Sequence, residues 1–265
     1  MKNKKNNELA ICGLAAVRAL SKEHPEKIQR FYFSSSKASQ FGDLCKYLAQ
    51  NKIPYNKVEL EDLEKLCGSI HHQGVVAMIE EEILPPLTNS IVMGWIANNE
   101  SAILLDRVGN ANNLGAIVRS AAFFGIKNII LPLNEAQSSI TTSSYRVAQG
   151  GMEYVNIYSI RSVVRLLQDM EGKMIRIGTD VRAHTTVWDM KKICTKKSVL
   201  VVLGNEEYGI SSVIKDNCDY LVLIPSAYMI DKEYGGDIDN APVESLNVAQ
   251  AASVILYELS KVGHK

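Results

Sequence analysis

No hydrophobic run in this sequence is long enough to cross a membrane, although hydrophobic residues make up 46% of its 265 positions. The first eight residues, MKNKKNNE, are polar and do not form a secretory signal peptide. The five cysteines are odd in number and have no C-x-x-C spacing, which argues against a disulfide framework or a zinc site. We therefore expect a cytoplasmic protein with free thiols and a substantial apolar core.

Charge of one sign is not in excess, since 29 Lys and Arg residues balance 29 Asp and Glu residues. Composition alone therefore points neither toward nor away from nucleic acid. The sequence has no G-x-G-x-x-G motif and no P-loop, which counts against a nucleotide-binding enzyme that acts on small molecules. His71 and His72 are adjacent and have no nearby Cys or carboxylate in the sequence, so we expect a loop or surface role and no metal.

The clearest strand–loop–helix–strand unit begins with the apolar run Ala102–Leu105. Residues 109–115 predict a polar loop, and the pattern from Ala116 to Phe124 predicts a helix that ends at Gly125. Asn128–Leu131 predicts the next strand. In open α/β sheets ligands bind beyond the carboxyl ends of the strands, so this loop is the first candidate site.

Arg119 differs from its mostly apolar neighbours in the predicted helix. It follows Gly115 by four residues, and helical side chains lean toward the N-terminus, so its guanidinium should lie over the loop with Asn112 and Asn113. One interpretation is an arginine that snorkels from a half-buried helix. The other is a cation that acts on a ligand.

Strands and helices alternate along most of the chain, which indicates a mostly parallel sheet covered on both faces. Expected strands are Ile28–Phe33, Lys57–Leu60, Val75–Ile79, Tyr154–Tyr158, Met174–Gly178, Ser198–Leu203 and Tyr220–Ile224. Expected helices are Leu9–Leu20, Ser34–Gln50, Asp62–Cys67, Thr88–Ala97, Tyr145–Gly151 and Leu246–Leu259. A composition shift predicts a first domain of residues 1–81, a linker and connecting helix at 82–98, and a second domain of residues 99–265.

Two more polar loops follow predicted strands. The first, GNEEYG at 204–209, carries Glu206, whose carboxylate can accept hydrogen bonds from a ligand or an arginine. The second strand ends at Pro225, and after a long loop Ser245 and Asn247 open the final helix. Ser245 is a reasonable N-cap, whereas Asn247 has no strong structural reason to be asparagine.

These three segments together resemble the SpoU/TrmH family of SPOUT RNA methyltransferases. The family pattern N-x-G-x-x-x-R is found at Asn113–Arg119, and G-N/S-E-x-x-G at Gly204–Gly209. The third pattern, I-P followed by S-L-N-V, is found at Ile224–Pro225 and Ser245–Val248. The sequence HHQGVVA and an early I-x-G-x-x-A-V helix are similar to the family's substrate-binding domain, so the resemblance covers nearly the whole chain.

The resemblance implies a trefoil-knotted SPOUT methyltransferase domain with a mostly parallel α/β sheet and a small N-terminal α/β domain that binds RNA. It implies a homodimer, S-adenosylmethionine as methyl donor, and a ribose 2′-hydroxyl of structured RNA (rRNA or tRNA) as acceptor. The implied catalytic residues are Arg119, Asn113, Glu206, Ser245 and Asn247. The implied donor-binding residues are Thr179, Leu203, Gly204, Asn205, Gly209, Ile224, Pro225 and Leu246.

Methyl transfer from a sulfonium requires no acid at the leaving group, because the donor leaves as a neutral thioether. It requires in-line placement of oxygen and methyl, and help with the hydroxyl proton. Because a guanidinium rarely loses its proton, we favour Arg119 as a cationic stabiliser of the developing alkoxide over a literal base. Glu206, Ser245 and Asn247 would orient Arg119, the ribose or its phosphate.

Two features depart from the family. The R-x-S-x-G-A stretch reads RVAQGG at 146–151, without the serine, and Ile224 and Ser245 lie 21 positions apart, much farther than in the family. The insert at 226–242 is acidic and glycine-bearing, so we expect an exposed, mobile loop that acts as a lid over the donor. A loop that blocks the donor site would instead favour a non-catalytic RNA-binding protein with the same fold.

Overall fold

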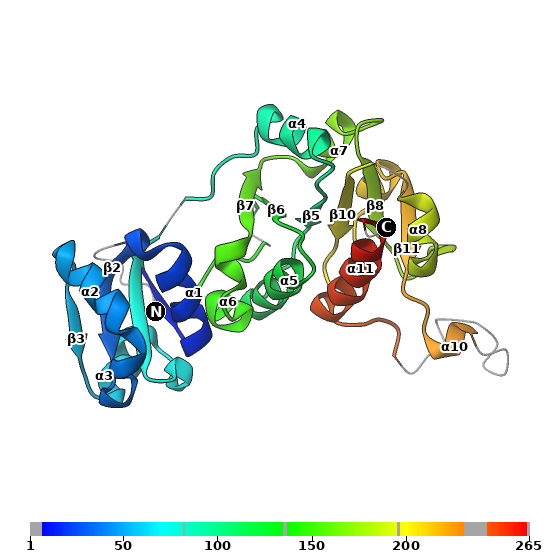
Figure 1. Ribbon diagram of the computed structural model, residues 1–265. Helices are drawn as coiled ribbons and strands as arrows, with labels where there is room; N and C mark the ends of the chain where they lie inside the picture. The colour runs from blue at the N-terminus through cyan, green and yellow to red at the C-terminus, as the bar shows by residue number, and fades with distance from the viewer. Residues whose placement is uncertain (1–6, 82, 135–136, 195–196, 231–242, 264–265) are drawn as a thin grey trace. The chain divides into compact units, whose positions relative to one another are not determined.

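The computed structural model describes residues 7–81, 83–134, 137–194, 197–230 and 243–263 (Figure 1). These residues form two compact units. The first contains the chain up to Ile83 together with Ser139–Tyr154, and the second contains Leu84–Ser138 and the chain from Val155 onward. The predicted boundary near residue 82 stays a prediction. No pattern in the sequence predicted that the segment 139–154 belongs to the first unit.

The first unit is built on a four-stranded sheet. Its strands are β1 (Glu8–Cys12), β2 (Ile28–Phe33), β3 (Tyr55–Lys57) and β4 (Val75–Glu80), in the order β1-β4-β2-β3. β4 pairs antiparallel with β1 and β2, and β2 pairs parallel with β3. Five of the six β4 residues are buried, because core residues pack on both faces of this strand.

Helices cover both faces of this sheet. Side chains of α1 (Leu14–Glu23) and α2 (Gly42–Gln50) share one core with β2, and those of α3 (Leu60–Cys67) share a smaller core with the other face. The expected helix Leu9–Leu20 is wrong in its first part. That part is β1, which pairs with β4, and the chain turns at Gly13 with a φ of 95° before α1 begins.

Residues 139–154 cover the free edge of β1. α6 (Thr142–Ala148) contacts this edge strand, and Ile140 and Tyr145 pack against the core on the α1 side. A Cβ at Gly150 would lie 2.8 Å from Ala19 Cβ, so the segment approaches α1 too closely for any side chain there. A helix over an edge strand also protects it from pairing with another chain.

The second unit contains a seven-stranded sheet, and every neighbouring pair of strands is parallel. The order is β7-β6-β5-β10-β8-β11-β9. The strands are β5 (Ala102–Leu105), β6 (Asn128–Pro132), β7 (Asn156–Ile160), β8 (Ile175–Thr179), β9 (Thr185–Thr186), β10 (Val199–Leu203) and β11 (Tyr220–Leu223). The expected α/β fold with a mostly parallel sheet is confirmed, while the knot stays a prediction.

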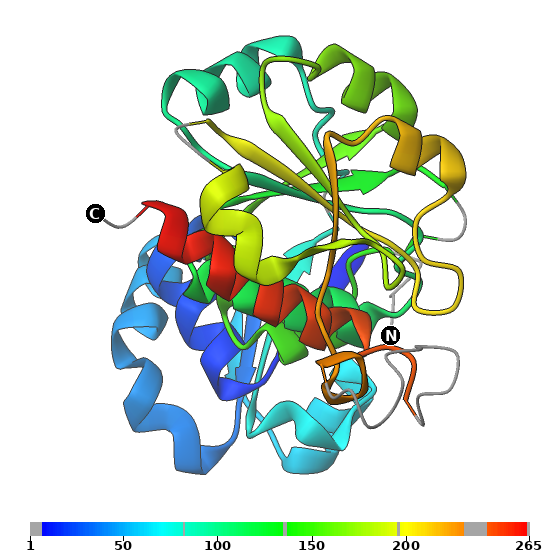
Figure 2. The same cartoon turned by 90° about the vertical axis from the view of Figure 1, so that its right-hand side faces the viewer.

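Helices lie on both faces of the parallel sheet, as Figure 2 shows. One face carries α4 (Asn89–Ala97), α7 (Val163–Asp169) and α9 (Ser212–Asp216), whose apolar side chains share a core with β5 and β10. The other face carries α5 (Ala111–Phe123), α8 (Met190–Ile193) and α11 (Val248–Gly263), with α11 packed on both α5 and α8.

The histidine pair has no metal-binding arrangement. The expectation was a loop or surface role, and both histidines lie in the short connection between α3 and β4. His71 is exposed, whereas His72 is buried and accepts a hydrogen bond on Nδ1 from the Gly74 N–H at 3.0 Å. Among the described residues no cluster of His, Cys, Asp or Glu is suited to hold a metal ion. The described helices also include none with the length and apolar character needed to span a membrane.

Candidate functional site

The first motif lies on a helix and not in a loop. α5 begins at Ala111 because the Asn110 side chain accepts a hydrogen bond from the Asn112 N–H at 2.8 Å and caps the helix. The expected loop at 109–115 is therefore wrong from Ala111 onward, and Asn113 is held on the first turn of α5. A side chain on a capped helix has a better-defined position than one on a loop.

The Asn113 side chain connects the three motifs. Its Nδ2 donates to the carboxylate of Glu206 in the loop after β10, and its Oδ1 accepts from Asn247 Nδ2 at 3.2 Å. Asn247 also caps α11, because its Oδ1 accepts from the Ala249 N–H at 2.9 Å. Asn247, and not Ser245 as expected, is therefore the capping residue, which gives this asparagine a structural reason.

The loop after β10 is tied together by its own side chains. Asn205 Oδ1 accepts from the backbone N–H groups of Glu207 and Tyr208 at 2.9 and 3.1 Å, while its Nδ2 donates to the Arg107 carbonyl at 3.1 Å. Arg107 Nη2 in turn donates to the Gly209 carbonyl at 3.1 Å. The sequence interpretation missed Arg107, although its place two residues after the end of the strand Ala102–Leu105 could have indicated it.

Gly204 allows the two ends of this loop to meet. A Cβ at Gly204 would lie 2.4 Å from the Gly209 carbonyl carbon and 2.5 Å from the Ile210 nitrogen. Both are backbone atoms, which cannot swing aside as a flexible side chain can. The close contact fits the antiparallel bridge between Asn205 and Gly209. Only glycine is compatible with this crossing.

A cavity of about 560 Å³ opens beside these loops, within the second unit. This volume falls in the usual range for small-molecule sites. All eight residues expected to bind the donor line it: Thr179, Leu203, Gly204, Asn205, Gly209, Ile224, Pro225 and Leu246. Glu206 and Ser245, expected on the acceptor side, line it as well.

The cavity wall also contains residues that the sequence interpretation missed. Asp180 forms an ion pair with Lys215 Nζ at 2.6 Å, and both side chains line the cavity. The Ser226 hydroxyl is buried on the same wall without a hydrogen-bond partner in the described part of the chain. The sequence could have indicated Asp180 as a cavity residue, because it directly follows Thr179 at the end of β8.

Arg119 is exposed on α5, and its side chain makes no hydrogen bond or ion pair with any residue that the structure describes. It does not line the 560 Å³ cavity. A guanidinium without a partner in the protein has all of its donors available to a ligand. Its expected position over Asn112 and Asn113 stays a prediction.

The first residues of the insert at 226–242 line the donor cavity. Ala227–Ile230 forms a short helix, α10, and Ser226 and Met229 line the cavity wall. The expectation of an exposed loop is therefore wrong for these first residues. The rest of the insert, 231–242, lies outside the described residues, so the lid interpretation stays a prediction there.

The chain belongs to the SpoU rRNA methylase family. Residues 100–232 match that family, and residues 10–84 match the RNA 2′-O ribose methyltransferase substrate-binding domain. The 23S rRNA (guanosine-2′-O-)-methyltransferase RlmB of Acinetobacter baylyi is 30% identical over 93% of this chain and 94% of that protein. The resemblance read from the three sequence motifs is confirmed.

Solved structures show the same fold at lower identity. The SpoU methyltransferase AviRb of Streptomyces viridochromogenes, in complex with the cofactor AdoMet, has a TM-score of 0.70 and 20% identity, and the match covers 97% of this chain and 91% of that one. The AdoMet-bound rRNA methyltransferase of Sinorhizobium meliloti has a TM-score of 0.72 and 20% identity, with 99% and 90% covered.

Proposed function

We propose that this protein transfers a methyl group from S-adenosylmethionine to a ribose 2′-hydroxyl of structured RNA, ribosomal or transfer. The proposal rests on one observation. The residues expected to bind the donor line a single cavity, and Asn113 connects Glu206 in the wall of that cavity to Asn247 by hydrogen bonds. Membership in the SpoU rRNA methylase family and the activity named for the Acinetobacter relative support it.

The cavity suits S-adenosylmethionine in size and chemistry. Apolar side chains at the strand ends and on α11, among them Leu203, Leu223 and Ile255, offer a surface for an adenine ring. The carboxylates of Glu206 and Glu244 favour a cationic ligand such as the sulfonium. The buried Ser226 hydroxyl, which has no partner among the described residues, is a candidate contact for a polar group of the donor.

The bound donor supplies an electrophilic methyl group, and the chain's own residues act on the acceptor. Asn113 holds Glu206 and Asn247 in fixed relation at the cavity edge. Arg119, on the same helix and without a protein partner in the described chain, would bind the ribose oxygen and stabilise the developing alkoxide. A guanidinium keeps its proton, so we assign Arg119 a stabilising role and not that of a base.

We further propose that residues of the first unit bind RNA and that the protein works as a cytoplasmic homodimer. The match of residues 10–84 to a substrate-binding domain supports the first point. An aromatic surface on α5 and α11 supports the second. Phe123 is 83% exposed and Tyr257 is 51% exposed, and both rings contact Phe124.

A transfer assay with radiolabelled S-adenosylmethionine tests the function. The protein is incubated with deproteinised bacterial rRNA and, separately, with tRNA, and the label is located after nuclease digestion. We expect label on a ribose 2′-oxygen. RNA binding without transfer would contradict the proposal and support the non-catalytic RNA-binding alternative. Sedimentation of Phe123→Glu tests the dimer, and we expect it to be monomeric.

A further inference from the structure

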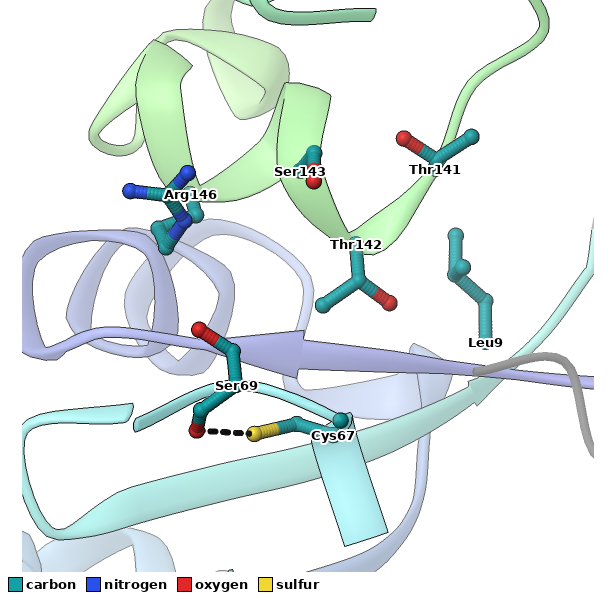
Figure 3. Close-up of a pocket in the computed structure, with 8 residues that line it drawn as sticks. Leu9, Cys67, Ser69, Thr141, Thr142, Ser143 and Arg146 are labelled. Carbon is teal, nitrogen blue, oxygen red and sulfur yellow. Dashed lines mark hydrogen bonds between the residues drawn. The ribbon is translucent and has the colours of Figure 1, made fainter. Parts of the chain in front are cut away.

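The first unit contains a second cavity, of about 290 Å³, at the free edge of β1. It lies between α6 and the turn that follows α3, and it shares no lining residue with the donor cavity of the second unit. Figure 3 shows its lining side chains, which are Leu9, Cys67, Gly68, Ser69, Thr141, Thr142, Ser143 and Arg146. The sequence motifs assign no function to this place.

Arg146 gives this cavity a positive charge. It is partly exposed, its guanidinium has no hydrogen bond or ion pair with the residues that the structure describes, and no lining residue carries a carboxylate. A guanidinium without a carboxylate nearby favours an anion, and its planar fork fits the oxygens of a phosphate. The charge of the lining therefore selects anionic ligands.

Residues with hydroxyl groups line the same cavity as this arginine. Thr142 and Ser143 come from the start of α6, one turn before Arg146, and the Ser69 hydroxyl points toward α6 from the opposite wall (Figure 3). Thr142 is only 9% exposed, yet its Oγ1 has no hydrogen-bond partner in the described part of the chain. A buried hydroxyl without a partner is unfavourable, so a ligand in the cavity would satisfy it.

The walls of the cavity are held in place without a ligand. The Cys67 thiol donates to the Ser69 carbonyl at 3.3 Å, and Gly68 ends α3 in the left-handed conformation with a φ of 66°. Across the cavity, Thr141 and Ser144 form a reciprocal capping box that fixes the start of α6. A site whose walls are already ordered loses little conformational entropy on binding.

We propose that this cavity is a phosphate-binding site that takes an internucleotide phosphate of the substrate RNA. This inference rests on the proposed function, because it assumes that the first unit binds RNA. Arg146 would pair with the phosphate, Ser69, Thr142 and Ser143 would donate hydrogen bonds to it, and Leu9 would contact the adjoining sugar. The cavity is larger than a single phosphate requires, which favours a phosphate within a chain over a free ion.

Affinity for rRNA across a series of salt concentrations tests the site. Neutralising one phosphate contact lowers the slope of log K against log salt by about 0.7–0.9. We expect Arg146→Gln to weaken binding about tenfold and to lower the slope by this amount. Thr142→Val keeps the volume of the side chain and should weaken binding several-fold with little change in slope. Arg18→Gln is the matched control: this arginine, in the same unit, bonds Gln40 and does not line the cavity.

In the transfer assay, Arg146→Gln should raise KM for RNA and leave kcat and donor affinity unchanged. Unaltered RNA affinity and slope in both Arg146→Gln and Thr142→Val would overturn the inference, as would an equal effect of Arg18→Gln. If Arg146→Gln lowers the slope as expected but the wild type transfers no methyl group to RNA, the proposed function fails and the phosphate site stands.

A second measurement distinguishes RNA from free phosphate. Thermal unfolding of the full chain is followed with inorganic phosphate, with ionic strength held constant by chloride. Stabilisation by phosphate that Arg146→Gln abolishes, together with unchanged RNA affinity, would identify free phosphate as the ligand and overturn the RNA assignment. We expect RNA binding to respond to Arg146→Gln and free phosphate to stabilise the protein only weakly.

Discussion

At the scale of single residues, Arg119 is exposed and has no partner among the described residues. We expect Arg119→Ala to lower kcat about 100-fold or more, because an electrostatic group aimed at a developing oxyanion typically contributes that much. Donor affinity, measured by calorimetry, should stay within a few-fold, since Arg119 does not line the donor cavity.

Arg119→Lys should also be largely inactive, because a point charge cannot reproduce the guanidinium fork. Arg165→Ala serves as the control, since this exposed arginine pairs only with Asp169 on α7 among the residues that the structure describes. If Arg119→Ala keeps most of its turnover, the assigned role is wrong.

A second residue-scale prediction concerns Asp219, which accepts two hydrogen bonds from the buried guanidinium of Arg176, at 2.6 and 3.0 Å. These bonds hold the pKa of Asp219 below its usual range. Asp219→Asn removes the two short bonds and leaves the buried Arg176 guanidinium with the more distant Glu171 carboxylate, at 4.0 Å, as its ion-pair partner among the described residues. We expect a loss of about 2 kcal/mol in the free energy of unfolding at pH 7.

The depressed pKa of Asp219 also predicts a pH dependence. Its stabilising effect is present above the unfolded-state pKa of about 4 and is lost as pH falls through the lower folded-state value. The difference in stability between the wild type and Asp219→Asn should therefore begin to shrink near pH 4 and vanish only below the lowered folded-state pKa. Urea unfolding followed by tryptophan fluorescence measures this, because Trp95 and Trp188 both lie in the second unit. Asp169→Asn, in an exposed pair, should change stability by less than about 0.5 kcal/mol.

At the scale of elements, the loop after β10 depends on the backbone crossing at Gly204. A methyl group there would overlap the Gly209 and Ile210 backbones, and we expect Gly204→Ala to destabilise the second unit by about 3 kcal/mol or more. Gly94→Ala is the matched control. Gly94 lies inside α4, and a methyl group added to it would have no neighbouring atom within 4 Å, so its replacement should stabilise by about 0.5–1 kcal/mol.

The midpoint of urea unfolding measures both glycine variants. If Gly204→Ala is as stable as the wild type, the loop can move to admit the methyl group without losing free energy of unfolding. The close approach of Gly204 to the Gly209 and Ile210 backbone would then have no structural importance. Donor affinity provides a second readout, since Gly204 lines the donor cavity.

At the scale of the whole molecule, the donor cavity lies entirely in the second unit. A truncated protein that begins at Pro86 should therefore bind S-adenosylmethionine within a few-fold of the full chain. The same truncation removes the core against which Ile140 and Tyr145 pack. We expect the amides of α6 to lose protection from hydrogen exchange, while those of α5, which packs on α11, keep theirs.

Two results would contradict these expectations. Loss of donor binding by a folded truncated protein would place part of the donor site in the first unit. Full protection of α6 after truncation would mean that residues 139–154 are ordered by the second unit, against the packing of Gly150 on α1.

The sequence by itself determined the parallel α/β sheet and the family. Strands such as Ala102–Leu105 and Ile28–Phe33 appear at their predicted positions. Ala102–Leu105 is a short, fully buried apolar run, and such a run bounded by polar residues has few other folded states. The three motifs identified the family because the residues within each segment keep a fixed spacing, although the two segments of the third motif lie farther apart than in the family. All eight residues that the family resemblance implies for donor binding line one cavity.

Only the tertiary structure decided the features that depend on contacts between distant segments. The residues of β1 fit a helical pattern, and pairing with β4, far along the chain, made them a strand. Asn247 caps α11, and its side chain also forms a hydrogen bond with Asn113, which lies 134 positions away in the sequence. The docking of residues 139–154 on the first unit, and with it the Arg146 cavity, likewise depends on packing that local sequence patterns do not contain.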